Sequence, residues 1–235
     1  MVSTEPPKLA VGSNPRLIPI SVGTMPARSH PVKYAVVDDA TEVRWANPHP
    51  PNWSGWEARY DNDVECGKRA SRDFIAFPDD VLRLSGDLTS APVTAAIADA
   101  FGFDPEQFVH DPTWHGGGVH VTEPGGWLNC HLDYALHPYI PDMRRAVNLI
   151  VFLHDRWEQG WGGEFYLADG HGKPVEIIEP RPGRAILFET SDVSYHGVLP
   201  VTGPMDRVSL AIYYLAPAGP ETSRLRALFM PTRRK

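Results

Sequence analysis

The chain has 235 residues, a length that fits one large domain with a substantial hydrophobic core. Hydrophobic residues make up 42% of it and charged residues 22%, which is ordinary for a globular protein. The formal net charge of -7 argues against a nucleic-acid partner or an anionic membrane surface, because both select basic patches. Cys66 and Cys130 are too few for a disulfide framework, and no apolar run has the roughly 20 residues of a membrane span, so we expect a cytoplasmic protein.

The first part of the chain predicts little regular structure before one helix. Residues 1 to about 30 contain five prolines and no periodicity, which predicts an extended arm. Residues 42–56 hold three tryptophans among prolines and predict an irregular segment packed on the body. A helix is predicted from about residue 90 to 101, because apolar residues recur at helical spacing and Gly102 is a stop signal. Residues 104–106, Asp-Pro-Glu, predict the start of a second short helix.

From about residue 115 onward, short β-rich runs recur between turn residues such as Pro124-Gly125-Gly126. The predicted strands are 117–122, 127–133, 146–154, 164–168, 175–178, 184–189, 195–199 and 207–215. About eight short strands punctuated in this way predict an all-β sandwich or barrel. We therefore predict a mainly β protein with a jelly-roll core over residues 111–235. The N-terminal arm and supporting helices of residues 1–110 buttress that core within one integrated domain.

Three residues form a candidate metal site. His131 and Asp133 are two apart on a predicted strand, so their side chains point to the same face. His196 begins a later predicted strand. Two imidazoles and one carboxylate make the facial triad typical of non-haem Fe(II) oxygenases, which leaves metal positions open for other ligands. Taken singly, a His-x-Asp sequence arises by chance and a lone histidine is more often structural.

An arginine predicts an anion site further along the chain. Arg207, Ser209, Ala211 and Tyr213 share one face of the predicted strand 207–215. An inward arginine is costly to bury without an anionic partner. A ligand carboxylate bound in bidentate fashion, with the hydroxyl of Ser209 beside it, meets that need. An internal acidic side chain is the alternative partner.

The residues named above fall in short segments that occur in a characteristic order and spacing: 129–133, 144–153, 161–165, 182–191, 195–198 and 207–211. Over residues 127–215 the chain thereby resembles the prolyl-hydroxylase-like branch of the Fe(II)/2-oxoglutarate oxygenases. The first 110 residues or so show no such resemblance.

The resemblance implies a double-stranded β-helix core. It also implies that Fe(II) is held by His131, Asp133 and His196, which would be the catalytic centre, and that O2 reacts there. The distal carboxylate of the co-substrate 2-oxoglutarate would bind Arg207, helped by Ser209.

One position departs from the family pattern. Many relatives have a tyrosine on the strand after the metal motif that also contacts this carboxylate, and Phe152 stands at the matching position. Strand parity makes Asn129 and Asn148 the candidates to supply the missing hydrogen bond, although Asn148 could equally be a buried structural amide.

The implied reaction is hydroxylation of an unactivated C–H bond with release of succinate and CO2. We expect a small-molecule substrate (an amino acid, a sugar-containing metabolite or a natural-product intermediate), because no peptide-docking module is recognisable. A peptidyl, prolyl-type hydroxylase is the alternative. Readings from other classes are a jelly-roll zinc hydrolase or isomerase that uses the same ligands, and a non-catalytic binding module. The sequence does not predict the oligomeric state.

Other polar and aromatic residues near the motifs predict the mouth of the site. We expect it to be lined by a set of aromatic and basic side chains: Trp114, His115, His120, Trp127, Tyr134, His137 and Arg144. The alternative is that the aromatic members pack in the core. The glycines of residues 116–118 predict a flexible lip, because no phosphate-loop lysine follows them. His154 and His171 adjoin predicted loops, which predicts that they face solvent.

Overall fold

A computed structural model describes residues 27–45, 58–73, 77–220 and 222–231. Nearly all of the predicted N-terminal arm lies outside the described residues, as do Trp53 and Trp56. Trp45 is described and is buried, as predicted. Its backbone N–H donates a hydrogen bond of 2.6 Å to the carbonyl of Leu153, which joins this irregular segment to the core.

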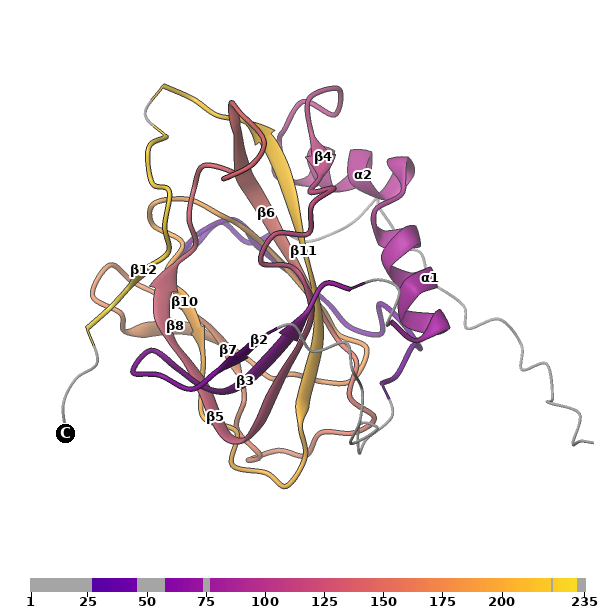
Figure 1. The fold of residues 1–235 in the computed structure, drawn as a ribbon, viewed down its shortest axis with the longest axis vertical. Coiled ribbons are helices and arrows are strands. Elements are labelled where there is room, and N and C mark those ends of the chain that lie inside the picture. Colours follow the sequence, from indigo (N-terminus) through magenta and orange to yellow (C-terminus); the bar gives the residue numbers. More distant parts are fainter. Residues whose placement is uncertain (1–26, 46–57, 74–76, 221, 232–235) are drawn as a thin grey trace, which may run out of the picture.

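The core consists of two four-stranded antiparallel sheets that share one long strand, β5 (Gly118–Leu132). The first half of β5 pairs with β11 (Arg207–Pro217), which pairs with β6 (Met143–Phe152), which pairs with β9 (Ala185–Glu189). The second half of β5 pairs with β10 (His196–Val198), followed by β7 (Phe165–Ala168) and β8 (Pro174–Ile178). Because the chain passes back and forth between the two sheets, the fold is the predicted double-stranded β-helix, which Figure 1 shows as a rolled sheet.

The predicted turn at Pro124-Gly125-Gly126 is the place where β5 passes from one sheet to the other. The two predicted strands 117–122 and 127–133 are therefore one continuous strand. A Cβ on Gly126 would lie 2.8 Å from the carbonyl oxygen of Cys66 and 2.9 Å from that of Glu123, so only glycine fits this crossing.

Short strands extend the core on several sides. β1 (Tyr34–Val37) adds to β9, and β4 (Val109–His110) adds to the end of β11. β2 (Ala58–Tyr60) and β3 (Glu65–Ser71) form a hairpin that pairs with β5 through β3. β12 (Leu228–Phe229) pairs with the metal-motif end of β5. The sequence predicted only an arm and helices for the N-terminal region, so the strands β1 to β4 were not predicted.

Two helices lie side by side against the rolled sheet (Figure 1). The predicted helix is α2 (Ala91–Phe101), and it ends at Gly102 in the left-handed conformation with φ of 81°. α1 (Asp79–Leu88) was not predicted. The second short helix predicted from residue 104 is wrong, because Asp104 instead closes a turn by accepting hydrogen bonds from Glu106 N and Gln107 Nε2.

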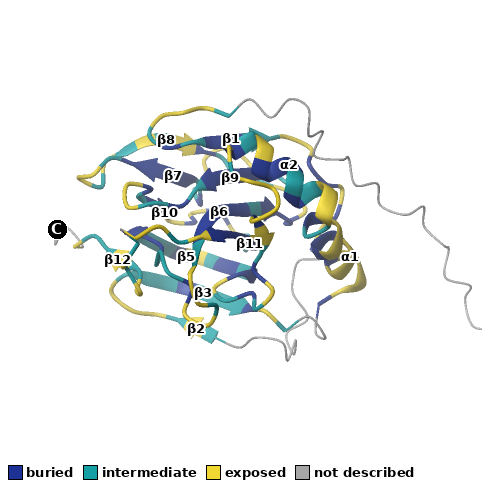
Figure 2. Ribbon diagram, turned by 90° about the horizontal axis from the view of Figure 1, so that it is seen from above, coloured by how far each residue is buried: buried dark blue, intermediate teal, exposed yellow. Residues whose placement is uncertain are grey.

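The helices cover the outer face of the sheet that contains β11, as predicted. One side of β11 carries Val208, Leu210, Ile212 and Tyr214, and all four are buried in one cluster with apolar residues of both helices. The hydroxyl of Tyr214 donates to the carbonyl of Leu88 at 2.8 Å, which ties the sheet to α1. Full burial of each such side chain contributes roughly 1.5–3 kcal/mol. Figure 2 shows the buried central strands and the exposed outer sides of the helices.

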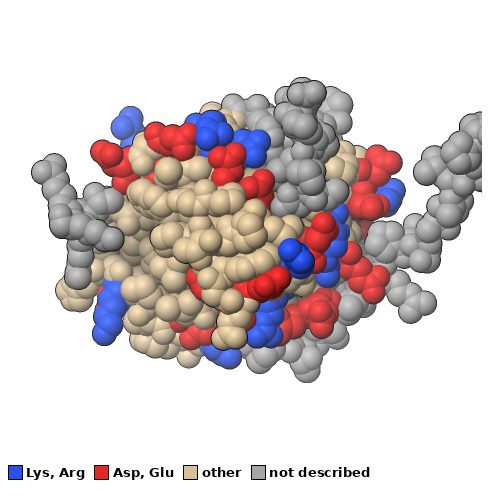
Figure 3. Space-filling view, turned by 90° about the horizontal axis from the view of Figure 1, so that it is seen from below, with Lys and Arg blue, Asp and Glu red and all other residues tan. Residues whose placement is uncertain are grey.

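The distribution of charge on the surface agrees with the ordinary content of charged residues in the sequence. On the face shown in Figure 3, acidic and basic side chains are interspersed around a broad area without charge. Among the described residues, neither helix has the length and apolar character that crossing a bilayer requires.

Candidate active site

Three buried side chains converge inside the double-stranded β-helix. His131 and Asp133 come from the end of β5, and His196 begins the neighbouring strand β10, directly opposite His131 in the register. One potential ligand atom from each residue lies within 4.8 Å of the other two. The side chains that the sequence predicted as a metal site are therefore brought together.

Backbone hydrogen bonds orient both imidazoles for metal binding. Nδ1 of His131 lies 2.9 Å from the carbonyl of Asn129, and Nδ1 of His196 lies 2.8 Å from that of Ser194. A carbonyl only accepts, so each Nδ1 carries a proton, and Nε2 is the ring nitrogen left to face a metal. Burial, followed by the nearby charge of His131, lowers the pKa of His196 to about 4, so this ring is neutral at pH 7.

Asp133 is held by neighbours on both of its oxygens. The hydroxyl of Tyr213 donates to Oδ2 at 2.9 Å, and Nη1 of Arg145 lies 3.7 Å from Oδ1. Burial by itself would raise the pKa of Asp133, but the adjacent His131, His196 and Arg145 outweigh it and hold that pKa well below its usual range. The carboxylate is therefore ionised and available to a cation.

Arg207 lies in the same cavity without an acidic partner. It is 3% exposed, its Nε donates to the carbonyl of Gly163 at 2.8 Å, and its Cζ lies 4.8 Å from the ring centre of Phe152. Its Nη2 has no hydrogen-bond partner, and no described carboxylate lies within 4.0 Å of the guanidinium. Burial lowers its pKa to about 9, which still leaves it charged at pH 7. A buried cation of this kind predicts an anionic ligand.

The metal cluster and Arg207 face one cavity of about 560 Å³. All four predicted residues on one side of β11 line it: Arg207, Ser209, Ala211 and Tyr213. The predicted alternation of β11 is thus confirmed, with the opposite side turned towards the helices.

Comparison of the sequence with known families gives a match over residues 117–215 to the 2OG-Fe(II) oxygenase superfamily. The matched segment belongs to this superfamily. It provides the core of a 2-oxoglutarate-dependent dioxygenase, whose cofactors are Fe(II), 2-oxoglutarate and O2. The matched segment contains the clustered His131, Asp133 and His196 together with Arg207.

Comparison with other proteins adds little detail. No curated protein matches the sequence. Among solved structures, a prolyl-4-hydroxylase from Pseudomonas putida is similar at 20% identity and a TM-score of 0.48, covering 69% of this chain and 78% of that one. A prolyl hydroxylase from Trichoplax adhaerens, in complex with a hypoxia-inducible-factor peptide, is similar at 21% identity and a TM-score of 0.45, covering 64% and 63%. Similarities of this size carry no argument about the substrate.

The two asparagines expected to assist the co-substrate have different positions in the oxygenase. Asn148 lies in the cavity wall, is buried, and has an Oδ1 without a hydrogen-bond partner. Asn129 does not line the cavity, and the prediction that it assists the co-substrate is not supported. Its Nδ2 instead donates to the carbonyl of Met230 at 2.8 Å, which fastens the C-terminal segment beside β12.

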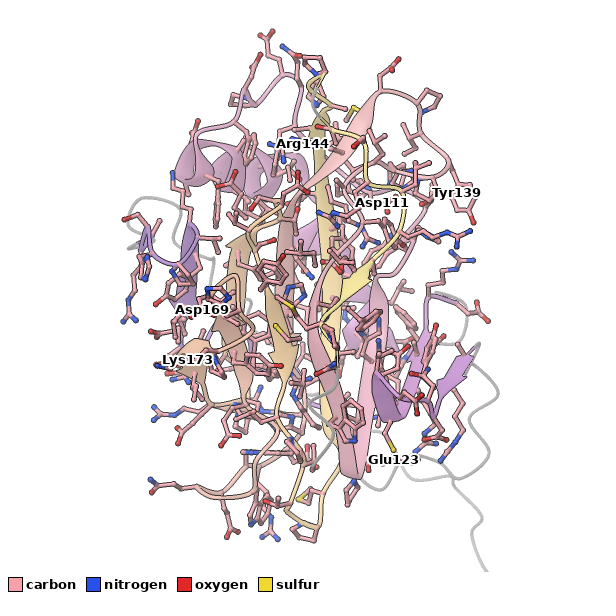
Figure 4. All side chains as sticks on the ribbon, turned by 90° about the vertical axis from the view of Figure 1, so that its left-hand side faces the viewer. Asp111, Glu123, Tyr139, Arg144, Asp169 and Lys173 are labelled. Carbon is pink, nitrogen blue, oxygen red and sulfur yellow. The ribbon has the colours of Figure 1, made fainter. Side chains whose placement is uncertain are left out.

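Three of the side chains expected at the mouth of the oxygenase line its cavity: His115, His120 and Tyr134. The remaining four lie elsewhere: Trp114, Trp127, His137 and Arg144. His137 is buried with its Nε2 3.1 Å from Oδ2 of Asp111, and Arg144 lies over the ring of Phe103. Figure 4 shows Asp111, Tyr139 and Arg144 towards one end of the molecule and Glu123 towards the other.

The prediction of a solvent-facing His154 is wrong, whereas His171 is exposed as predicted. The His154 ring lies inside, between the carbonyl of Pro180, to which its Nε2 donates, and the backbone N–H of Val208, which donates to its Nδ1. Both ring nitrogens therefore have backbone hydrogen-bond partners, so this polar ring can be buried without an unsatisfied group.

Sequence reasoning missed Arg145, although Arg145 belongs to one of the matching segments. On a regular strand it would lie on the opposite side from Asn148. The register of β6 with β11 shifts between Arg145 and Val147, so Ala146 is an extra residue and Arg145 turns into the cavity. No pattern in the sequence predicts this bulge.

Two walls of the cavity come from segments without a recognisable motif. The β2–β3 hairpin contributes Tyr60, Glu65 and Lys68, and the C-terminal segment contributes Phe229. The ring of Phe229 stacks on that of His131 with centroids 5.0 Å apart. The weak alternation of these short strands explains why they were not predicted.

Proposed function

We propose that the chain hydroxylates a small molecule, using Fe(II) held by His131, Asp133 and His196 and 2-oxoglutarate anchored on Arg207. One observation carries this proposal: a buried, oriented His-Asp-His cluster and a buried arginine without an acidic partner share one cavity. When bound, Fe(II) and 2-oxoglutarate supply the O2 activation that puts one oxygen atom into a substrate C–H bond and releases succinate and CO2.

The donor set fits Fe(II). Two imidazoles and one carboxylate on one side of a metal leave positions free for the co-substrate and O2. The hydrogen bonds from each Nδ1 to a backbone carbonyl hold the His131 and His196 rings in a ligating orientation without further adjustment. The hydroxyl of Tyr213 occupies one lone pair of Asp133 and so orients the carboxylate towards the imidazoles.

Arg207 fits the far carboxylate of 2-oxoglutarate. Its unpartnered Nη2 supplies a charge-assisted donor, and the register places Ser209 two residues along the same wall. Ser209 lies opposite His120 on one side and Phe152 on the other. Phe152 brings no hydroxyl, and His120 and Asn148 are polar groups of the wall that can complete the hydrogen bonds.

The shape of the cavity supports a small substrate. Its volume of about 560 Å³ lies within the range of small-molecule sites, roughly 300–1,000 Å³. The β2–β3 hairpin, the loop around Gly116 and the C-terminal segment with Phe229 all contribute to its wall.

The experiment is an anaerobic titration of the Fe(II)-loaded protein with 2-oxoglutarate, followed by the visible absorption band that a 2-oxo acid gives when it chelates Fe(II). We expect the band in the wild type, and a dissociation constant about 10- to 100-fold higher in Arg207→Gln, from the ~1.5–3 kcal/mol of a hydrogen bond to a charged group. Arg83→Gln is the matched control, since Arg83 is exposed on α1 and pairs with Asp80.

Absence of the band in the wild type would contradict the proposed function, and an unchanged affinity in Arg207→Gln would contradict the role of that residue. Succinate formation is then measured with free metabolites and with proline-containing peptides. Stimulation by peptides alone would show that the substrate is peptidyl.

A further inference from the structure

The C-terminal segment, residues 222–231, lies along the end of β5 that carries two of the proposed metal ligands. Near its start, the carbonyl of Arg224 accepts a hydrogen bond of 2.8 Å from the backbone N–H of Ala135. Further along, the backbone N–H of Met230 donates to the carbonyl of Cys130 at 2.8 Å. The C-terminal segment therefore follows β5 past the whole metal motif.

The same segment is also fastened to the loop that leads into the second metal-bearing strand. Nη2 of Arg224 donates to Oδ1 of Asp192 at 2.7 Å. Asp192 lies in the loop between β9 and β10, and β10 begins with His196. The C-terminal segment thus holds together the two parts of the chain that supply the proposed ligands.

Phe229 is the side chain that this segment directs at the metal cluster. In the pairing of β12 with β5, Phe229 lies opposite His131 and Leu228 lies opposite Leu132. Residues opposite each other on paired strands point to the same face, so Phe229 shares the cavity face with His131. Phe229 indeed lines the cavity and is half-buried, whereas Leu228 lies on the other face and is 52% exposed.

The ring of Phe229 covers one face of the His131 imidazole. The two ring centres are 5.0 Å apart and the ring planes differ by 21°, which is a stacked arrangement. The hydrogen bond between Nδ1 of His131 and the carbonyl of Asn129 holds one edge of the same imidazole. Because an edge contact and a face contact together restrict rotation of the ring, Phe229 helps to keep Nε2 directed at the metal position.

The position of Phe229 along β5 separates it from the co-substrate anchor. Arg207 lies opposite Thr122 in the first half of β5, whereas Phe229 lies opposite His131 near its end. The antiparallel pairing places Ala227, which also lines the cavity, still further along β5 from Arg207. Since 2-oxoglutarate would extend from the metal towards Arg207, the apolar space beside Phe229 and Ala227 remains for the substrate.

We propose that Phe229 is a positioning residue for His131 and a specificity-determining residue of the substrate site. Its ring holds the imidazole in the ligating orientation and forms the wall against which the reacting end of the substrate packs. This inference rests on the proposed function and deepens it. The substrate presents an apolar group at its reacting end, and the size of residue 229 limits the bulk of that group.

The positioning role is tested by titrating the metal-free full chain with Co(II). We expect a dissociation constant about two- to tenfold higher in Phe229→Ala, the range that corresponds to the loss of one stacked ring pair, together with a changed visible spectrum of bound Co(II). Phe229→Tyr keeps the ring and should keep the affinity of the wild type. Leu228→Ala is the matched control, because it shortens the neighbouring side chain on the outer face of the same segment. Equal affinity and equal spectra in Phe229→Ala and Leu228→Ala would refute the positioning role.

The wall is tested with toluene, a probe that needs no identified substrate. Phe229→Ala leaves space for an aromatic ring beside His131, and apolar cavities of this size bind small aromatic molecules. In the Fe(II)–2-oxoglutarate form without O2, toluene should change the visible band of Phe229→Ala at a concentration at least tenfold lower than for the wild type or Leu228→Ala. The same response in all three proteins would show that residue 229 does not border the space beside the metal. Phe229→Leu, which leaves a smaller space, replaces Phe229→Ala in both tests if the alanine variant does not fold.

The effect on specificity is measured by succinate formation with metabolites ranked by the size of their apolar group. Phe229→Ala should favour bulkier metabolites than the wild type does, with a ratio of kcat/KM values for the bulkier over the smaller ones at least tenfold higher. Leu228→Ala should keep the ranking of the wild type. An unchanged ranking in Phe229→Ala, or a wild type stimulated only by metabolites without an apolar group, overturns the specificity role.

The failure of this inference is distinguishable from the failure of the proposed function. A wild type that gives the band with 2-oxoglutarate, while Phe229→Ala behaves as Leu228→Ala does, keeps the function and loses the role of Phe229. A wild type that gives no band loses both.

Discussion

The hydrogen bond from Tyr213 to Asp133 allows a sharp test of the metal site. Tyr213→Phe removes only the hydroxyl that donates to Oδ2 at 2.9 Å, while the ring that covers Arg145 remains. A hydrogen bond to a charged group contributes roughly 1.5–3 kcal/mol, and each 1.4 kcal/mol changes an equilibrium constant about tenfold. Because the bond orients a proposed ligand, we expect the dissociation constant for metal to rise about 10- to 100-fold.

The adjacent residue provides a matched control. Tyr214 also donates its buried hydroxyl, at 2.8 Å, but to the carbonyl of Leu88 on the helix side of the sheet. Tyr214→Phe should therefore lose about 1 kcal/mol of unfolding free energy and keep the metal affinity of the wild type. Each variant removes one buried hydroxyl from β11, Tyr213→Phe on the cavity face and Tyr214→Phe on the helix face.

The assay is a calorimetric titration of metal-free protein with Co(II), a divalent ion that tolerates air, repeated anaerobically with Fe(II). Urea unfolding of the metal-free variants separates stability from affinity. Equal metal affinity of Tyr213→Phe and the wild type would refute the reasoning, since it would mean that Asp133 neither binds the metal nor depends on Tyr213 for its orientation.

Three further predictions concern other parts of the structure. Burial lowers the pKa of His154 from 6.5 to about 4, so the unfolded chain binds a proton at this imidazole at a higher pH than the folded chain does. The unfolding free energy should therefore fall as the pH drops from 6.5 towards 4, by at most ~1.4 kcal/mol per pH unit. Urea unfolding of the wild type and of His154→Gln at pH 7 and pH 5 checks that the unfolding free energy of the variant falls less. Gly116→Ala would place a Cβ 2.5 Å from Nη2 of Arg145 at a φ of 74°, so we expect a loss of ~1–3 kcal/mol in thermal unfolding, and unchanged stability would contradict this close approach. Asn129→Ala should speed hydrogen exchange around Met230 without changing the affinity for 2-oxoglutarate. A weaker affinity would show that Asn129 does assist the co-substrate.

The sequence predicted best where one physical rule acts over several residues. On β11 the alternation of polar and apolar residues assigned Arg207 and Ser209 to the cavity and Val208 and Leu210 to the helix side, because both faces of that strand are buried against different partners. The spacing of His131 and Asp133 predicted a shared face for the same reason. Their approach to His196, however, followed from resemblance, since spacing on one strand says nothing about a partner on another strand.

The errors arose where the tertiary structure overrides local pattern. Arg145 reaches the cavity through a bulge, and the β2–β3 hairpin is rich in charged residues that by themselves indicate a solvent-exposed segment. His154 is buried because two distant backbone groups satisfy it, which no local sequence encodes. Asn129 has the parity of His131, yet the carbonyl of Met230 engages its side chain.

The pairing pattern of β5 has a consequence for how the protein assembles. Its partners come from β3 near one end of the chain, from β10 and β11, and from β12 near the other end. Contacts between residues so distant in sequence slow folding, because large loops must close before the pairing stabilises them. During synthesis β5 emerges long before β10, so His131 meets His196 only after most of the polypeptide has left the ribosome. The proposed iron site would therefore be completed only late in the maturation of the chain.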